Sequence, residues 1–271
     1  ELNHIRDFRN RVFHYEKVIN KDNYNQIFDE IDEVLFYFDK ELFDLHIEEI
    51  AKTIAKLISK KLKSKLWFYE KKCLVYVKDN LKSILEADNN QMKKYIEYFK
   101  NHFPKAIGDF NTEEKKWKRL YKILRKDIFE KEYNNWSKRK TYGSYKFVET
   151  LDLKTCPYCN RNYTFIVDEE SGKLRPEIDH FYPKSIYPFL AMSFYNLIPS
   201  CPICNHTKSS KVSENLINPY DIKDDDFKFT YKPTDISFSE VESKKYNMDS
   251  FEIEFKNQNE NINIFKLDEL Y

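Results

Sequence analysis

The chain has 271 residues with a formal net charge of +1, and charged residues make up 34% of it. This length can form one large or two modest domains with hydrophobic cores. The near-zero net charge excludes a polycation that binds nucleic acid through its overall field, so such binding must come from local patches.

Amino-acid usage favours helices over strands. The chain contains only 3 Gly and is rich in Lys, Glu, Leu and Ile, which indicates a mainly helical protein with one small irregular module. No stretch approaches the ~18 apolar residues that span a bilayer, and no secretory signal is visible at the start. We therefore expect a cytoplasmic location without membrane contact. Because the chain begins with Glu1 rather than Met, we also expect a segment of a longer protein.

Residues 1–66 are expected to form a first helical region. Apolar side chains recur there at helical spacing, first at Ile27, Ile31, Val34, Leu35 and Phe38, then at Ile47, Ile50, Ile54, Leu57 and Ile58. A basic run from Lys60 to Lys65 follows, and we interpret it as a solvated helix end.

Residues 67–145 are expected to form a second helical region with a basic face. Its apolar face is predicted at Leu81, Ile84, Leu85, Met92, Tyr95 and Tyr98. The basic side chains are Lys115, Lys116, Lys118, Arg119, Lys122, Arg125 and Lys126, followed by Lys138, Arg139 and Lys140. This face either follows a nucleic-acid backbone or is solvated and paired with Glu113, Glu114 and Glu130, and the sequence leaves both alternatives open.

Residues 146–271 are expected to form a third region, because short segments, prolines and cysteines follow a break at Gly143. Strands are predicted at 163–167 and 174–179, with a turn at 168–173 between them. Alternation of apolar and polar residues at 227–231 and 251–255 predicts two further strands.

Four of the five cysteines form two Cys-x-x-Cys pairs, Cys156 with Cys159 and Cys201 with Cys204, whereas Cys73 stands alone. Each pair directs two thiolates to one point, and two pairs supply the four soft ligands that structural Zn²⁺ prefers. Four thiolates leave no position for water, so this Zn²⁺ would fold the module without taking part in chemistry. Buried cysteines and a redox pair are the alternatives, although a redox pair does not need a matched second pair.

A cluster of polar residues lies between and after these pairs. Asp179-His180 and Asn196-Leu197 lie between them, and the second pair runs directly into Asn205-His206-Thr207-Lys208. In this order the residues resemble the HNH endonucleases of the zinc-knuckle type, whose pattern is CxxC, Asp-His, Asn-Leu, then CxxC followed by His or Asn and a Lys. The resemblance covers roughly sixty residues and is specific as a combination.

The resemblance implies an α+β fold, in which the mainly helical N-terminal region precedes a zinc-stapled ββα-metal HNH domain with additional short strands. A strand ending at Asp179-His180 would pair with one near residues 195–200, and a helix would begin near Asn205. Asp179 and Asn205 would bind Mg²⁺ or Mn²⁺, because hard oxygen ligands suit these cations. His180 would be the general base, since its ordinary pKa near 6.5 makes the free base available at neutral pH.

The remaining motif residues have supporting roles in the resemblance. Asn196 would brace the loop that aims the base, and Lys208 would contact the phosphate or cap local charge. The chain carries Asn205 where the commonest pattern has His, and His206 beside it is a possible backup ligand. The spacing favours Asn205, since it follows Cys204 directly and precedes Lys208 by three residues.

Longer phrases resemble one branch of this family. The stretches "CPYCNRNY", "EIDHFYPKSIYPFLAMSFYNLIPSCPICN" and "NLINPYD" resemble the HNH effector of Septu-type anti-phage defence systems, also found with some retrons. The resemblance implies a defence role, a helical recruitment region and an ATPase partner.

A second, shorter motif lies near the N-terminus. Arg9 and His14, in the phrase "RNRVFHYE", match the Arg-x4-His pattern of HEPN ribonucleases and resemble Abi-like abortive-infection proteins. Five residues apart on a helix, they could flank one phosphate; a salt-bridged helix face with Asp7 and Glu16 is the alternative.

Together these patterns predict a metal-dependent endonuclease, with DNA favoured as its substrate. Two alternatives remain: a zinc-stabilised module that binds nucleic acid or protein without cleaving, and a ribonuclease acting through Arg9 and His14.

Overall fold

The structure is a computed structural model that describes residues 40–108, 118–169, 172–223, 226–233 and 251–269. The chain forms two compact units, one up to Lys211 and one from Val212. It is helix-rich with short antiparallel strands, which confirms the α+β class. The predicted helix at Ile27–Phe38 and the Arg9/His14 motif lie outside the described residues. The expected boundaries at residues 66 and 145 stay predictions.

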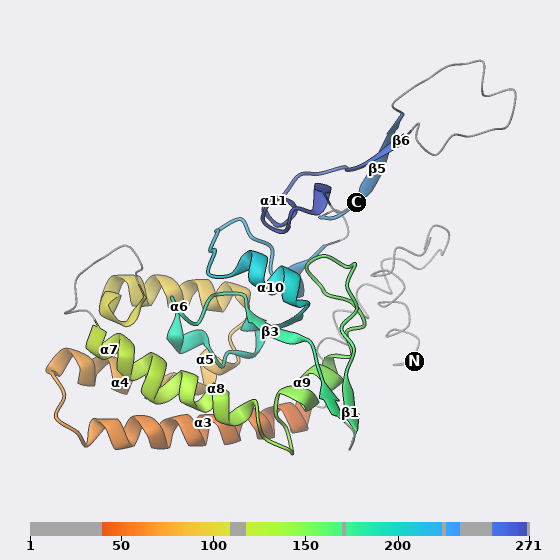
Figure 1. Ribbon diagram of the computed structural model, residues 1–271. Helices are drawn as coiled ribbons and strands as arrows, with labels where there is room; N and C mark the ends of the chain where they lie inside the picture. Colours follow the sequence, from red (N-terminus) through yellow and green to blue (C-terminus); the bar gives the residue numbers. More distant parts are fainter. Residues whose placement is uncertain (1–39, 109–117, 170–171, 224–225, 234–250, 270–271) are drawn as a thin grey trace, which may run out of the picture. The chain divides into compact units, whose positions relative to one another are not determined.

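Helices make up most of the first unit (Figure 1). Their bounds are α3 Lys40–Leu62, α4 Phe68–Asp79, α5 Leu81–Leu85, α6 Asn89–His102, α7 Lys118–Lys122, α8 Glu130–Trp136 and α9 Ser144–Leu151, with the 3-10 turn η1 at Pro104–Ala106. Helical spacing places one side of α3 in the core, where the exposed fractions of Ile54 and Ile58 are both 0%. The predicted apolar residues of α3 and α5 are buried apart from Leu57, whereas in α6 Met92 is buried and Tyr95 and Tyr98 are half-buried. None of the helices in the described ranges is both long and apolar enough to cross a membrane.

A π-helix, η3 Ile123–Phe129, joins α7 to α8 without a break in the chain's helical path. Leu124, Ile128 and Phe129 are fully buried within it. It packs against α3 and against the 3-10 turn η4 Pro188–Leu190, which belongs to the strand-containing part of this unit. π-helices are rare and often lie at functional sites. Because η3 runs directly into α8, its winding sets the direction in which the side chains of α8 point.

The basic face around α7 is largely paired with carboxylates. Arg119 lies 3.4 Å from Glu70, and Arg125 and Lys126 lie 3.6 and 2.8 Å from the same carboxylate oxygen of Glu130. The pairing with Glu130 is the one that the solvated-face alternative expects. A role of this face in following a nucleic-acid backbone stays a proposal.

Two paired strands, separated by a loop, and a helix lie near the end of the first unit. β3 Glu177–His180 pairs antiparallel with β4 Leu197–Ser200, and α10 Pro202–Lys208 comes next. The register places His180 opposite Leu197 and Glu177 opposite Ser200. The predicted pairing is therefore confirmed, but the helix begins at Pro202 rather than near Asn205. Pro at the first helical turn is favourable because that N–H would have no intrahelical partner.

The prediction of a strand at 163–167 was wrong for most of its length. β1 Val167–Glu169 pairs with β2 Gly172–Leu174, so the hairpin lies further along the chain. Upstream, Tyr163 forms only an isolated bridge with Thr155, and the Thr164 N–H donates to the Lys154 carbonyl. The predicted strand at 174–179 is divided into β2 and β3, because Pro176 has no N–H to donate to a ladder.

The loop between β3 and β4 is anchored on the helices. It contains η4 and the turn η5 Phe194–Asn196. Phe189 stacks on Phe99 of α6 with ring centroids 3.8 Å apart, and the Ser193 hydroxyl donates to the Ile84 carbonyl at 2.7 Å. The helical region thus sets the position of the loop that follows His180.

The second unit contains a hairpin and a short helix. β5 Phe229–Pro233 pairs antiparallel with β6 Phe251–Phe255. The strand predicted at 251–255 is confirmed, whereas the one predicted at 227–231 begins two residues later, at Phe229. Helix α11 Glu260–Phe265 follows, with 3-10 turns η6 at Pro219–Asp221 and η8 at Leu267–Glu269. The buried Asn261 side chain accepts from the Ile217 N–H at 2.7 Å and donates to its carbonyl at 2.9 Å. This amide joins α11 to the start of the unit.

Candidate metal centre and candidate active site

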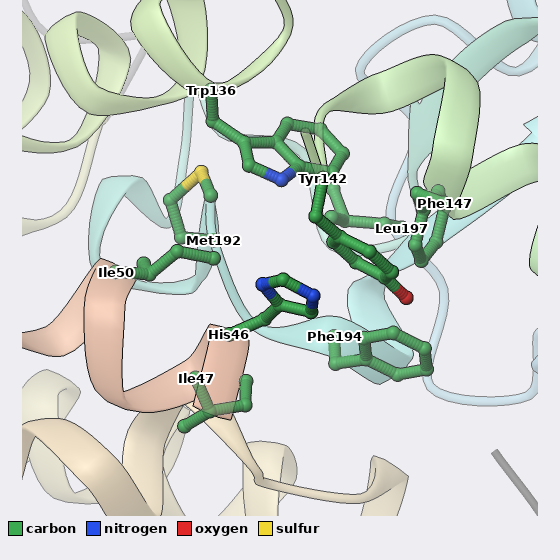
Figure 2. A pocket seen from close by; sticks show the side chains of 9 residues that line it. All are labelled: His46, Ile47, Ile50, Trp136, Tyr142, Phe147, Met192, Phe194 and Leu197. Carbon is green, nitrogen blue, oxygen red and sulfur yellow. The ribbon is translucent and has the colours of Figure 1, made fainter. Parts of the chain in front are cut away.

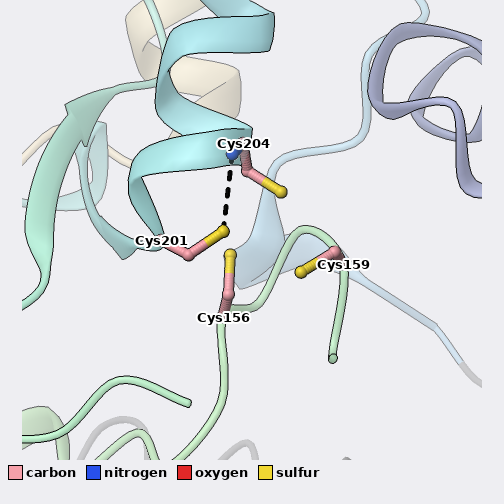
Figure 3. Close-up of side chains that lie close together, drawn as sticks. All are labelled: Cys156, Cys159, Cys201 and Cys204. Carbon is pink, nitrogen blue, oxygen red and sulfur yellow. Dashed lines mark hydrogen bonds between the residues drawn. The ribbon is translucent and has the colours of Figure 1, made fainter. Parts of the chain in front are cut away.

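The four cysteines of the two pairs form a thiol cluster (Cys156, Cys159, Cys201 and Cys204; Figure 3). Their sulfur atoms all lie within 4.8 Å of one another, and none of the four residues is more than 3% exposed. A tetrahedral site with Zn–S bonds of about 2.3 Å needs sulfur atoms about 3.8 Å apart. The cluster therefore has the spacing, the burial and the ligand chemistry to hold a zinc ion.

Local backbone geometry directs these thiols to one point. Cys201 is the N-cap of α10, and its sulfur accepts from the Cys204 N–H at 3.4 Å. The Asn162 amide donates to the Cys201 sulfur at 3.3 Å and to the Cys159 sulfur at 3.8 Å. A hydrogen bond with Cys156 is the largest cause that lowers the pKa of Cys159 to about 6. All four thiols are free of disulfides, and donors of this kind stabilise thiolate ligands.

The second group, the Asp179–His180 cluster, comprises Asp179, His180, Tyr158 and Lys208. The same Asp179 oxygen accepts from the Tyr158 hydroxyl at 2.7 Å and lies 2.9 Å from the Lys208 ammonium. Lys208 is fully buried and also donates to the His180 carbonyl at 2.8 Å. Since two donors converge on one oxygen, the other carboxylate oxygen is left for a further ligand. Of its two expected roles, Lys208 has the geometry for capping charge.

Asn205 joins this region through Glu177. Its amide nitrogen donates to a Glu177 carboxylate oxygen at 2.6 Å, so its carbonyl oxygen is the atom available to a cation. Glu177 and Asp179 occupy alternate positions of β3 and share one face of the strand. The adjacent His206 has a 78% exposed side chain and lies 3.9 Å from Glu177. Three oxygen-bearing residues thus suit the hard cations Mg²⁺ and Mn²⁺.

His180 is held in one tautomer by the backbone. It is 5% exposed, and its Nε2 lies 3.0 Å from the Ala191 carbonyl oxygen. Because a carbonyl can only accept, Nε2 carries the proton. Nδ1 of the neutral ring is an acceptor to which none of the described residues donates. Burial, reinforced by Lys184, lowers the pKa of His180 well below 6.5. The ring is therefore neutral at physiological pH and can accept a proton at Nδ1.

Asn196 closes the loop that contains Ala191. Its side chain is fully buried, accepts from the Tyr182 N–H at 2.7 Å, and donates to the carbonyls of Tyr182 and Leu190 at 3.0 and 2.8 Å. Tyr182, on the chain leaving His180, and Leu190, the residue before Ala191, are therefore tied to one amide. This is the geometry that the expected bracing role requires.

Sequence reasoning missed two residues around His180. The ring of Tyr133, from α8, lies 4.8 Å from the His180 ring, and the Lys184 ammonium lies 4.3 Å from the centre of the same Tyr133 ring. Lys184 stands in the stretch that carries the resemblance, four residues after His180. Tyr133 carries no such signal, because its helix is remote in sequence.

A small cavity lies beside β4 and is distinct from the cation ligands. It has a volume of about 20 Å³ and a mainly apolar lining that includes Leu197, Met192 and Ile50 (Figure 2). Among the described residues, His46 Nε2 and Trp136 Nε1 at its wall have no hydrogen-bond partner. The volume suits one water molecule and is far too small for a nucleotide.

Comparison with known proteins finds one relevant similarity. The chain is 42% identical over 66 residues to the Septu protein PtuB of Bacillus thuringiensis, a match that covers 24% of this chain and 23% of that protein. No protein-family model matches the chain, and no solved structure matches it.

Proposed function

We propose that this chain is a metal-dependent HNH-type endonuclease that hydrolyses phosphodiester bonds, with DNA as the favoured substrate. The observation that carries the proposal is His180, a neutral imidazole whose Nε2 is held by the Ala191 carbonyl, directly after Asp179 on β3. A buried histidine held in one tautomer supplies the unprotonated ring nitrogen that general-base hydrolysis needs.

In the proposed reaction, Nδ1 of His180 takes a proton from water while the water oxygen attacks phosphorus. The bond to the 3′ oxygen breaks, and that oxygen takes a proton from solvent. The Nε2–H bond to the Ala191 carbonyl stabilises the imidazolium that forms. Asp179 and Asn205, with Glu177 close by, would hold a divalent cation, which would neutralise charge on the phosphate.

The proposal gives the two clusters separate tasks. The thiol cluster would hold structural Zn²⁺, and its four sulfur ligands leave no position for water. Asn196 would hold Leu190, the residue before Ala191, and so steady the loop whose Ala191 carbonyl orients His180. Lys208 would fix α10 against β3 through its bonds to Asp179 and to the His180 carbonyl. Both are thus positioning residues rather than proton carriers.

We further propose a role in anti-phage defence, together with an ATPase partner in the cytoplasm. The similarity to a Septu protein supports this role, and the longer phrases of the sequence resemble the HNH effectors of such systems. The low net charge agrees with a nuclease that depends on a partner for recruitment to nucleic acid.

A cleavage assay tests the enzymatic part of the proposal. Plasmid DNA and RNA are incubated with the chain, with and without Mg²⁺ or Mn²⁺, and His180→Ala is compared with His102→Ala. His102 is an exposed histidine at the end of α6 and serves as the matched control. We expect His180→Ala to lower the cleavage rate by about 10²-fold or more while zinc content is unchanged.

The other outcomes separate the alternatives. DNA cleavage by His180→Ala at the wild-type rate would contradict the proposal. Metal-independent RNA cleavage that survives this substitution supports the Arg9/His14 ribonuclease. Nucleic-acid binding without cleavage under any metal condition supports the non-catalytic module. Copurification with an ATPase tests the partner separately.

A further inference from the structure

We propose that Lys184, held over the ring of Tyr133, binds a backbone phosphate of the nucleic acid next to the bond that is cut. This inference rests on the proposed function and adds a substrate contact to it. It also assigns a role to α8 of the helical region, which supplies the tyrosine.

Lys184 and His180 contact the same aromatic ring. The Lys184 ammonium lies 4.3 Å from the Tyr133 ring centre, and the His180 ring centre lies 4.8 Å from it. A cation over the face of an aromatic ring is attracted by the ring's quadrupole. The Lys184 ammonium and the proposed general base thus contact the same tyrosine ring. A phosphate that reaches His180 would therefore also come close to the ammonium.

The charge on Lys184 is not neutralised within the described ranges of the chain. No carboxylate lies within 4.0 Å of its ammonium there, and it makes no hydrogen bond to any of those residues. Its neighbours Arg125 and Lys126 are different, because both are paired with Glu130. Burial is the largest cause that lowers the pKa of Lys184, while Glu130 and Asp179 raise it. A half-buried ammonium with only a π face as partner is suited to an incoming anion.

A second cation lies near the same tyrosine. Burial raises the pKa of Tyr133 to about 12, and Arg175 opposes this rise electrostatically. Arg175 donates to the Pro176 carbonyl and lies over the Tyr145 ring, and it has no carboxylate partner in the described ranges. Lys184 and Arg175 together therefore place two cations near Tyr133, where the Asp179 carboxylate acts in the opposite sense. A bound phosphate would meet both cations.

The chemistry points to the backbone of the substrate rather than to its bases. Lysine is a compact point charge on a flexible stem and imposes little geometry on its partner, unlike the planar fork of arginine. Contacts to phosphate position a nucleic acid without selecting its sequence. We therefore expect Lys184 to contribute to affinity for any sequence and to have little part in specificity.

The test measures kcat and KM for a DNA duplex over a range of salt concentrations. Wild type is compared with Lys184→Gln, Lys184→Arg and Lys105→Gln. Lys105 is the matched control, since it is an exposed lysine over another tyrosine ring, 5.7 Å from the centre of Tyr69. Duplex binding without divalent cation is measured in parallel by fluorescence anisotropy.

For Lys184→Gln we expect KM and Kd to rise roughly 3- to 10-fold. The slope of log Kd against log salt concentration should fall by the amount that roughly one phosphate contact contributes. kcat changes less, Lys184→Arg stays near wild type, and Lys105→Gln has no effect. Zinc content and Tm confirm that each variant is folded. If Lys184→Gln does not fold, Lys184→Met takes its place, and unchanged KM, Kd and salt dependence in that variant overturn the inference.

The two proposals fail in different ways. If wild type cuts DNA but Lys184→Gln has unchanged KM, Kd and salt dependence, the phosphate contact is wrong and the nuclease assignment stands. If wild type and all variants bind DNA but none cuts any nucleic acid, the nuclease assignment is wrong, and the binding data alone decide the role of Lys184.

Discussion

The thiol cluster and the Asp179–His180 cluster lie in the same part of the chain but are built differently. The thiol cluster draws all its ligands from two four-residue segments. The Asp179–His180 cluster takes its partners from the first Cys-x-x-Cys segment, from the loop before β4 and from α10, and its ring neighbour Tyr133 comes from α8. Local spacing therefore sets each half of the first cluster, whereas the second depends on tertiary packing for nearly every partner.

Tyr158 joins the two clusters. It lies between Cys156 and Cys159 in the sequence, and its hydroxyl donates to Asp179. A metal that orders the first Cys-x-x-Cys segment would therefore also fix one partner of Asp179. The following substitutions test how far the clusters depend on each other.

The largest effect is expected for Cys201→Ser. It removes one of four sulfur ligands, and structural Zn²⁺ contributes about 10–16 kcal/mol of apparent binding free energy to such modules. We expect loss of bound zinc, measured by elemental analysis, and unfolding of the module, measured by circular dichroism. Cys73→Ala is the control, because Cys73 is buried in α4 away from the cluster and should leave zinc content unchanged. Retention of one zinc ion by Cys201→Ser would show that the four thiols do not act together.

Lys208→Met should have the next largest effect. It removes the cation from a buried ion pair and leaves the Asp179 charge with Tyr158 alone, which typically costs about 3–5 kcal/mol. The free energy of unfolding from urea titration measures this loss, and zinc content should remain. Lys211→Met, at an exposed position just after α10, should change stability by less than about 0.5 kcal/mol. Equal stabilities of the two variants would contradict the importance of the buried pair.

Tyr158→Phe tests the link between the clusters directly. It removes one hydrogen bond to a buried carboxylate, and bonds to charged groups contribute about 1.5–3 kcal/mol. We expect a loss of that size in urea unfolding with zinc still bound. Tyr163→Phe is the comparison, since Tyr163 is 59% exposed. A Tyr158→Phe protein as stable as wild type would mean that the clusters are energetically independent.

The smallest effect is expected at His206. Its side chain is largely exposed, so His206→Ala should leave the cleavage rate nearly unchanged. Asn205→Ala removes a proposed cation ligand and should lower the rate by about 10- to 100-fold, the range seen even for residues around a metal's own ligands. Titration of activity with Mn²⁺ distinguishes weakened cation binding from misfolding. A larger loss of activity in His206→Ala than in Asn205→Ala would mean that His206, and not Asn205, binds the cation.

The sequence predicted the parts of this molecule whose determinants are close together. The Cys-x-x-Cys pairs predicted the thiol cluster, and alternation predicted β5 and β6. The strand predicted at 163–167 failed because alternation cannot tell which backbone a segment will pair with, and Thr164 bonds to Lys154 instead. The HNH resemblance anticipated the β3–β4 pairing, but not the contacts that surround it.

The surroundings of His180 could not be predicted in the same way. The Ala191 carbonyl orients the ring through its backbone, so no side chain marks that residue in the sequence. Glu177 stands two residues before Asp179, but its contact with Asn205 depends on where α10 lies against β3. Tyr133 reaches His180 only because α8 packs there. Packing across long sequence separations decides each of these contacts.

The π-helix η3 has a consequence for how related chains can diverge. Each residue of an α-helix advances the chain by about 100° around the helix axis. A π-helix winds by a smaller angle per residue, because its hydrogen bonds join residues i and i+5. If substitutions let Ile123–Phe129 wind as a regular α-helix with all its residues kept, every later side chain of α8 would rotate around the helix axis. Tyr133 would then face another direction, although its identity and all the motif residues from Cys156 onward were unchanged. A related chain without this π-helix can therefore keep every recognisable motif and still lack the aromatic ring beside its histidine.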